Sequence, residues 1–217
     1  VCLDLPEYGL SKLSLNKPSQ KCFPLEDEVV FLLASNCTRL QHLQLSWMSE
    51  LKYATRLHLV TGLFRQIIRN NPPLTHLNME CFSDDRDSNE SVGEAILEAL
   101  LNSTIMTIKH LNLSHNDSWF RDEETKEERE GIVDLLTEII SMQADCPNVL
   151  NLGCNEFSSS GTEKLLTTIA ARVERFSYAP HEINLSEANF DSDQSVEKLA
   201  QILSKAVDFK RLDIILQ

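Results

Sequence analysis

The chain has few aromatic residues, few glycines and no long apolar run. Aromatic residues make up 6% of the 217 residues, while apolar residues as a whole reach 42%, so a core must be mainly aliphatic. With only six glycines, the chain has no glycine-rich phosphate loop, and it also lacks the GxSxG and HExxH motifs. No apolar stretch approaches the roughly 20 residues that span a bilayer, and no signal peptide is visible. The sequence therefore predicts a protein that is not an enzyme, needs no cofactor and does not cross a membrane.

Basic residues are also scarce compared with acidic ones. There are 20 Lys and Arg against 33 Asp and Glu, which gives a formal net charge of -13. A chain of this sign is repelled by nucleic-acid phosphates and by anionic lipid headgroups. The largest local basic cluster is Lys210 with Arg211. We therefore expect no nucleic-acid or membrane partner, and instead a protein partner with a basic rim, in a larger assembly.

The six cysteines are scattered, without a CxxC pair or the spacing of a metal site; they are Cys2, Cys22, Cys37, Cys81, Cys146 and Cys154. This usage favours buried free thiols in a reduced, cytoplasmic compartment, with disulfides as the alternative. No metal is expected. Because the sequence starts at Val1 rather than Met, the chain is interpreted as a fragment or a processed product.

A short pattern recurs along the chain. Residues 108–116 (IKHLNLSHN) and 149–157 (VLNLGCNEF) each carry two leucines one residue apart and an asparagine three positions later. Similar apolar pairs fall at intervals of 29 to 39 residues, namely Leu13/Leu15, Leu43/Leu45, Leu77/Met79, Leu111/Leu113, Leu150/Leu152, Ile183/Leu185 and Leu212/Ile214. Such self-similarity is the signature of a repeat architecture.

Each apolar pair reads as a short strand of period two, and an amphipathic helical run follows it. The helical stripes lie at 29–33, 60–67, 92–100, 132–140, 165–173 and 196–203, and prolines near 72 and 147 stop two of them. The fold class is therefore α/β, with one strand and one helix in each unit. One such unit cannot bury its apolar face alone, but stacked units share a continuous core.

The two ends of the array are less regular. Residues 1–5 alternate like a strand, but they lie too close to Leu13 for a parallel crossover. Residues 1–9 are thus either a capping strand that turns back or the site of a chain discontinuity. Residues 212–216 are strand-like with no helix after them, and this exposed edge favours a truncation from a longer array.

Residues 150–157, followed by Gly161 and Leu165-Leu166, resemble the long leucine-rich repeat of the ribonuclease-inhibitor type. Residues 111–116 are a second good match, and 40–45 and 74–79 are partial ones. The resemblance covers about residues 10–217. It implies that the whole chain, residues 1–217, is a single leucine-rich repeat domain, a solenoid of about seven repeats. The curved parallel sheet would line the concave side, and the helices would lie on the convex side.

The resemblance also assigns a role to the asparagine that follows each pair. It is expected to hydrogen-bond the turn backbone between neighbouring repeats. Asn116 and Asn155 are present, but the position is occupied by Pro18, Met48, Phe82 and Ala188 in other units. Weaker turns, or turns satisfied in another way, are expected there.

Two residues of each strand should point from the concave sheet into solvent. The first column is Lys12, His42, His76, His110, Val149, Glu182 and Arg211, and the second is Ser14, Gln44, Asn78, Asn112, Asn151, Asn184 and Asp213. Neutral imidazole and amide groups both donate and accept hydrogen bonds, which suits a protein partner. The predicted partner-binding residues are His42, Gln44, His76, Asn78, His110, Asn112, Asn151 and Asn184. A metal or pH-sensing site is the alternative, but a ladder aligns side chains rather than converging them on one point.

The favoured function is non-catalytic protein recognition or scaffolding through this concave face. By resemblance, the alternatives are a GTPase activator that acts through an arginine and the sensor region of a larger receptor. Arg86 and Arg121 are the arginines in strand-to-helix loops. The loop with Asp85, Asp87 and Asn89 suggests a calcium site, but it lacks the glycine and the glutamate of an EF-hand. We therefore interpret it as an acidic surface loop. The charged run 122–130 is interpreted in the same way.

Overall fold

The computed structural model describes residues 2–3, 11–16, 37–48, 53–70, 72–82, 92–102, 108–120, 130–142, 147–176, 180–206 and 213–215. Its strands are β1 (Cys2–Leu3), β2 (Lys12–Asn16), β3 (His42–Ser46), β4 (His76–Asn78), β5 (His110–Asn112), β6 (Val149–Asn151), β7 (Glu182–Asn184) and β8 (Asp213–Ile215). Its helices are the 3-10 turn η1 (Cys37–Arg39), α2 (Tyr53–Asn70), α3 (Val92–Leu101), α4 (Asp117–Phe120), α5 (Glu130–Met142), α6 (Ser159–Phe176) and α7 (Asp193–Ala206).

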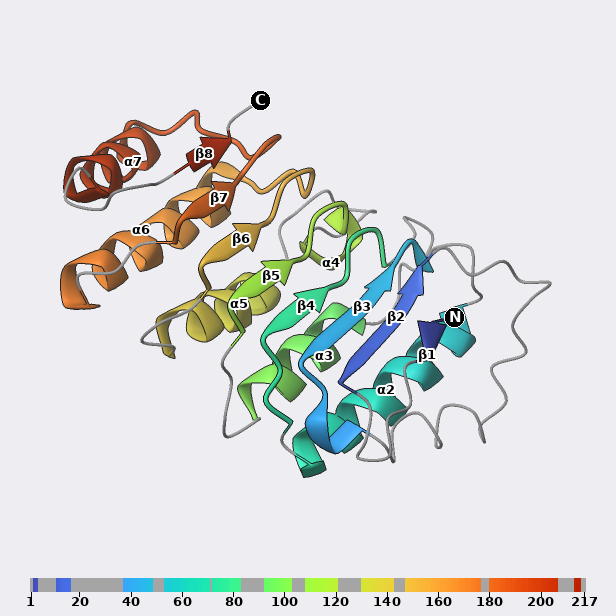
Figure 1. Cartoon of the computed structure of the whole chain (residues 1–217). Helices are drawn as coiled ribbons and strands as arrows, with labels where there is room; N and C mark the ends of the chain where they lie inside the picture. The colour runs from blue at the N-terminus through green and yellow to red at the C-terminus, as the bar shows by residue number, and fades with distance from the viewer. Residues whose placement is uncertain are drawn as a thin grey trace.

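The strands form one sheet in which every strand pairs with the next one in the chain. Strands β2 to β8 are parallel to one another. Strand β1 pairs with β2 in the antiparallel sense, with Leu3 opposite Leu13, which is the pairing of a strand that turns back. In Figure 1 the helices follow the same order as the strands and lie along one side of the sheet. The fold is therefore α/β, with strand–helix units stacked in chain order.

The predicted alternation of the strands places their apolar residues in the core. Leu13, Leu43, Leu77, Leu111, Leu150 and Ile183 stand side by side in the sheet register and are at most 2% exposed. The second row, Leu15, Leu45, Met79, Leu113, Leu152 and Leu185, is at most 3% exposed. Helical stripes cover these rows, for example Ile96, Leu97 and Leu100 of α3. The core is thus a continuous layer between the sheet and the helices.

The register predicted for the last unit was wrong. The pair Leu212/Ile214 was expected to continue Ile183/Leu185, but the structure places Ile214 opposite Ile183 and Asp213 opposite Glu182. Leu212, Ile214 and Leu216 all share one parity in the sequence. The alternation of apolar and polar residues predicts which face of the sheet these side chains take. It does not predict whether Leu212 or Ile214 stands opposite Ile183. The hydrogen bonds between β7 and β8 make that choice.

Asn116 and Asn155 tie neighbouring units together, as predicted. Both are buried, at 1% and 0% exposure. Asn155 Nδ2 donates to the carbonyl oxygens of Leu113 (3.0 Å) and Leu152 (2.9 Å), and its Oδ1 accepts from the Asn116 N–H at 2.7 Å. Asn116 repeats the pattern one unit earlier, since its Nδ2 donates to Met79 O at 2.7 Å and its Oδ1 accepts from the Phe82 N–H at 2.9 Å. Each amide therefore satisfies backbone groups of two adjacent turns.

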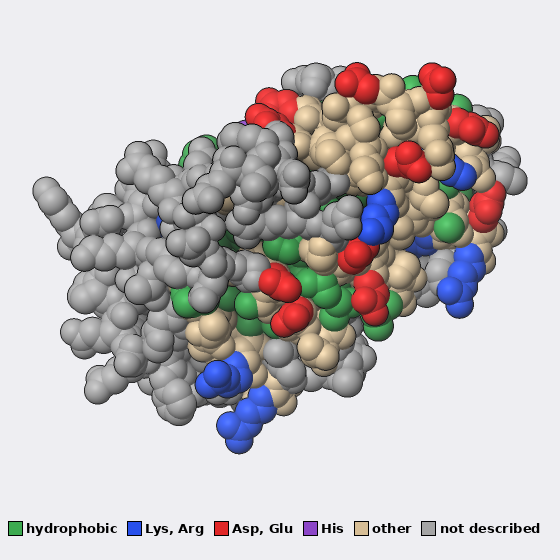
Figure 2. All heavy atoms as spheres, turned by 180° about the vertical axis from the view of Figure 1, so that it is seen from behind, with side chains coloured by type: hydrophobic (Ala, Val, Ile, Leu, Met, Phe, Trp, Pro, Cys, Tyr) green, Lys and Arg blue, Asp and Glu red, His purple; other side chains and the backbone are tan. Residues whose placement is uncertain are grey.

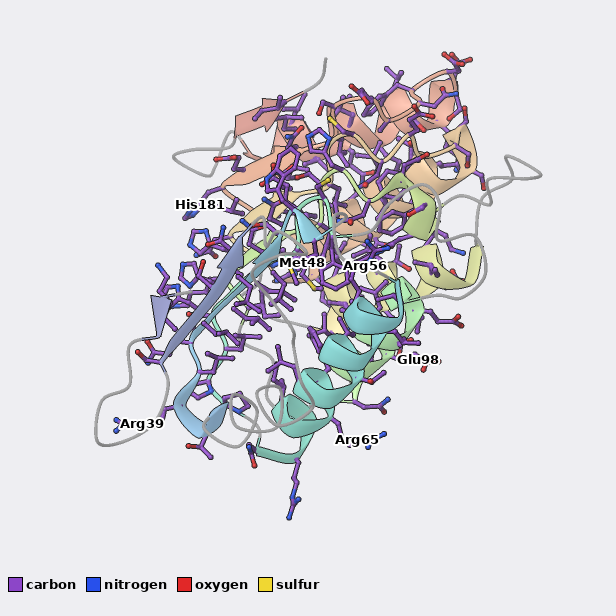
Figure 3. The ribbon with its side chains drawn as sticks, turned by 90° about the vertical axis from the view of Figure 1, so that its right-hand side faces the viewer. Arg39, Met48, Arg56, Arg65, Glu98 and His181 are labelled. Carbon is purple, nitrogen blue, oxygen red and sulfur yellow. The ribbon has the colours of Figure 1, made fainter. Side chains whose placement is uncertain are left out.

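The turns without this asparagine are satisfied in other ways. Met48 and Phe82 are both 0% exposed and fill the position with apolar volume. The buried Arg56 donates from Nη1 to the Met48 carbonyl oxygen at 3.3 Å, and Figure 3 shows the two residues close together near the start of α2. The Ala188 N–H donates to Leu185 O at 3.1 Å. The fourth such position, Pro18, lies outside the described residues.

The turns after β3 to β7, which the structure describes, nevertheless share one backbone conformation. Trp47, Cys81, His115, Cys154 and Glu187 occupy the same place after β3 to β7 and have φ between 49° and 66°. The N–H groups of the first four donate to the carbonyl oxygens of Glu80, Ser114, Gly153 and Ser186 in the following unit. This left-handed region costs free energy for residues other than glycine, so the inter-unit hydrogen bonds stabilise it.

Candidate functional site

One side of the sheet carries no described helix, and we call its two outward columns the open sheet face. The first column is Lys12, His42, His76, His110, Val149 and Glu182, and the second is Ser14, Gln44, Asn78, Asn112, Asn151 and Asn184. All are exposed or half-buried, whereas the leucines between them are buried. The structure thus brings together all eight residues predicted for partner binding. Arg211, predicted to follow Glu182, lies outside the described residues, and Asp213 takes that register position instead.

The three histidines form a continuous stack across β3, β4 and β5. The ring centroids of His42 and His76 are 4.0 Å apart with an interplanar angle of 22°, and those of His76 and His110 are 4.2 Å apart at 10°. Neighbouring strands lie about 4.8 Å apart, so identical side chains in register are brought within stacking distance. The rings therefore present one aromatic edge to solvent.

Two rings of the stack, His76 and His110, have lowered pKa values. Burial, followed by the charges of His110, His42, Lys109 and Lys12, lowers the pKa of His76 to about 4. Burial and His42 also lower the pKa of His110, with Glu182 acting in the opposite direction. A proton on one ring disfavours a proton on the next. At neutral pH His76 and His110 are therefore uncharged and can form hydrogen bonds with a partner.

Thr75 determines the tautomer of the central ring. Its Oγ1 lies 2.8 Å from His76 Nδ1 and donates to the Gln41 carbonyl oxygen at 3.1 Å. A hydroxyl has only one proton, so both hydrogen bonds form together only when His76 Nδ1 carries a proton and donates it to Thr75. The Nε2 atom of His76 is then an acceptor.

The side chains of the asparagine column form hydrogen bonds within the protein that the sequence does not predict. The Oδ1 atoms of Asn78, Asn112, Asn151 and Asn184 accept the backbone N–H two residues further on, at 3.0, 3.1, 3.2 and 3.0 Å. Gln44 accepts from Ser14 and donates to Ser46. Asn151 Nδ2 lies 3.4 Å from Ser114 Oγ. Within the described part of the chain, the Nδ2 groups of the other three asparagines have no partner, so this column offers mainly donors.

Gly153 leaves room for the side chain of Asn184 to lie close to its backbone. A Cβ at this position would stand 2.5 Å from Ser186 Oγ and 2.7 Å from Asn184 Nδ2. The corresponding positions in other units carry Ser46, Glu80, Ser114 and Ser186. Sequence reasoning missed this close approach, although a lone glycine in a column of larger residues is the signal that points to it.

A shallow hollow lies beside the face, where β6 and β7 lead into their helices. Its volume is about 520 Å³, and its lining is Glu156, Phe157, Ser158, Ser159, Glu187 and Asn189. The sequence analysis did not single out any of these residues as a site. The two carboxylates make this end of the sheet acidic.

The structure describes only some of the residues that could bind a metal ion or act through a thiol. Among them, no group of three or more His, Cys, Asp or Glu side chains is placed to hold a metal ion. Cys81 and Cys154 form no disulfide bond, and burial raises the pKa of Cys154. The loop with Asp85, Asp87 and Asn89, together with Arg86, Arg121 and residues 122–129, lies outside the described residues. No described helix is long and apolar enough to cross a membrane.

Comparison with known proteins adds no identification. No protein-family model matches the chain, and neither the curated proteins nor the solved structures contain a significant match. The function has to be argued from the open sheet face itself.

Proposed function

We propose that the chain is a leucine-rich repeat array of about seven repeats that works as a non-catalytic protein-recognition module. Three features support the repeat assignment. Strand–helix units stack in chain order, the strand leucines form unbroken buried rows, and Asn116 and Asn155 bridge adjacent turns. The array is a curved solenoid, with the open sheet face on its concave side.

The observation that carries the recognition role is the row of stacked histidines beside a row of amide donors. Both rows are held on paired strands, so little conformational entropy is lost when a partner binds. Imidazole acceptors and amide donors match the backbone and side-chain groups of another protein. The surface therefore recognises polar protein groups without the need for charge on the rings.

The charge distribution favours a partner with a basic rim. Figure 2 shows the side opposite the open sheet face, where Asp and Glu side chains are spread over the region of α6 and α7. Glu163, Glu174, Asp193 and Glu197 belong to these helices. Such charge speeds the association of a basic partner and makes the association rate fall with added salt.

The test begins with a partner recovered from native extract, which is then identified and purified. Its affinity is compared between the native chain and a variant with His76, His110, Asn78 and Asn112 all changed to Ala. We expect affinity to fall at least tenfold, with the fold checked by circular dichroism. Unchanged affinity would move the interface to the helices or loops.

Two further variants separate lost contacts from lost structure. Asn78→Asp and Asn112→Asp keep the oxygens that accept the N–H groups of Glu80 and Ser114 and replace the amide donors with negatively charged acceptors. Both should therefore remain folded and still weaken binding. A matched control changes Glu98, Glu138, Glu174 and Glu197 on the helices to Ala. This control should alter the salt dependence of the association rate and leave the dissociation rate nearly unchanged.

A further inference from the structure

Charged residues of opposite sign stand at the two ends of the first column of the open sheet face. Lys12 on β2 is exposed. Lys109, which directly precedes β5 near the middle of the sheet, lies beside the column and is also exposed. At the other end, Glu182 is half-buried on β7, and Glu187 is exposed in the turn after it. The acidic residue Glu80 lies in the basic half, but at the carboxyl edge of β4. Between Lys12 and Glu182, the two poles of the same column, stand the three stacked histidines and Val149.

These charges act on the same histidine stack: Lys12 from the β2 end, Lys109 from beside His110, and Glu182 from the β7 end. Lys109 and Lys12 both lower the pKa of His76. Glu182 opposes the lowering of the pKa of His110. The electrostatic potential along the first column therefore changes from positive at β2 to negative at β7.

The separation of the poles fits an extended peptide. Lys12 and Glu182 belong to strands five pairings apart in the sheet, which corresponds to about 24 Å at about 4.8 Å for each pairing. An extended chain rises about 3.3 Å for each residue. A segment of about seven or eight residues therefore spans the face from one pole to the other.

We propose that the open sheet face binds an extended protein segment with a carboxylate over Lys12 and a basic side chain over Glu182 and Glu187. The polar middle of the segment lies on the histidine stack and accepts hydrogen bonds from the asparagine amides. This proposal rests on the recognition function proposed above and adds the charge order of the ligand. A uniformly basic segment is opposed by Lys12 and Lys109, and a uniformly acidic one by Glu182 and Glu187.

The probes are two synthetic nine-residue peptides of identical composition. One has two aspartates at one end, two lysines at the other and an uncharged polar middle, and the second has the same charges alternating along its length. Isothermal titration calorimetry at low salt should show the segregated peptide binding at least about fivefold more tightly. Equal affinities, or no binding of the segregated peptide up to millimolar concentration, would overturn the proposal.

Charge reversals in the protein test the poles one at a time. Lys12→Glu and Glu182→Lys should each remove most of the preference for the segregated peptide. The double variant should restore it, because the peptide can then lie across the face in the opposite direction. A purely structural effect of the single changes would not be rescued in this way. Lys198→Glu and Glu197→Lys on α7 are the matched controls and should leave the preference unchanged.

The outcome also separates this proposal from the recognition function itself. If the peptide preference is absent while the His76, His110, Asn78 and Asn112 variant loses its purified partner, only the charge order is wrong. If that variant also keeps full affinity, the open sheet face is not the interface.

Discussion

Leu111 and His110 are neighbours on one short strand, yet Leu111 belongs to the buried side of the sheet and His110 to its exposed side. Leu111 is 2% exposed, and the same position in the adjoining strands is again an aliphatic residue. His110 is exposed, and its column changes from lysine to histidine, valine and glutamate across the sheet. Close packing against the helices allows little change on the buried side. Side chains of different size and charge can all be solvated on the open side. The side chains that distinguish one partner from another therefore lie there.

The largest expected effect compares a buried asparagine with an open one. Asn155→Ala removes three hydrogen bonds to buried backbone groups of two turns, so we expect a loss of about 3–5 kcal/mol in unfolding free energy. Asn112→Ala on the open sheet face breaks bonds that water can replace, and it should cost about 1 kcal/mol. Urea denaturation of both variants measures the difference. Equal costs would mean that the turns do not depend on the buried amide.

Leu150→Ala and Leu111→Ala test the apolar side. Each leucine is at most 2% exposed, and its truncation leaves a cavity between sheet and helices, so each should cost about 2–5 kcal/mol. The same urea titration measures the change. A cost below about 1 kcal/mol would contradict the continuous core described above.

Gly153→Ala tests how closely the open sheet face is packed. The added methyl group would overlap Asn184 Nδ2 and Ser186 Oγ, so one of these side chains must move, at a cost of about 1–3 kcal/mol. Gly131→Ala is the matched control, because a Cβ there meets nothing within 4 Å. Replacing that helical glycine should stabilise the protein by up to about 1 kcal/mol. A neutral Gly153→Ala variant would show that the asparagine column is mobile.

The histidine stack should make stability depend on pH. The pKa of His76 is about 4 in the folded chain against an ordinary value of 6.5, so the unfolded chain binds this proton first as pH falls. Stability should therefore decrease between about pH 6.5 and pH 4. Thermal unfolding of the native chain and of His76→Gln over this range isolates the effect, since carboxylates titrate alike in both. Parallel curves for the two proteins would contradict a pKa lowered by the stack.

The smallest expected effect is that of His110→Ala at neutral pH. The ring is exposed and lies at one end of the stack, so its removal should change the unfolding free energy by no more than about 0.5 kcal/mol. If His110→Ala is as costly as Leu111→Ala, the two sides of the sheet are not separated as described.

Much of the architecture follows from local pattern. Leucines one residue apart predict a strand with one buried side, and the spacing of the pairs predicts stacked strand–helix units. The outward positions of His42, His76 and Asn112 follow from the same parity. Asn116 and Asn155 stand at the place where a buried amide bridges two turns. These features depend on the two-residue period of a strand and on recurrence along the chain, both of which are visible in the sequence.

Other features depend on which strands become neighbours. Alternation gives the face of each residue but not the pairing partner, so it could not choose between Leu212 and Ile214 for the last strand. The stacking of His42 on His76 requires residues 34 positions apart to meet in register. The low pKa of His76 likewise depends on burial within the assembled sheet and on its neighbours His110 and His42. The inward-turned oxygens of Asn78 and Asn184 and the left-handed Trp47 depend on backbone geometry at the turns. Local sequence determined what each strand buries, and inter-strand hydrogen bonding decided what its exposed side can offer a partner.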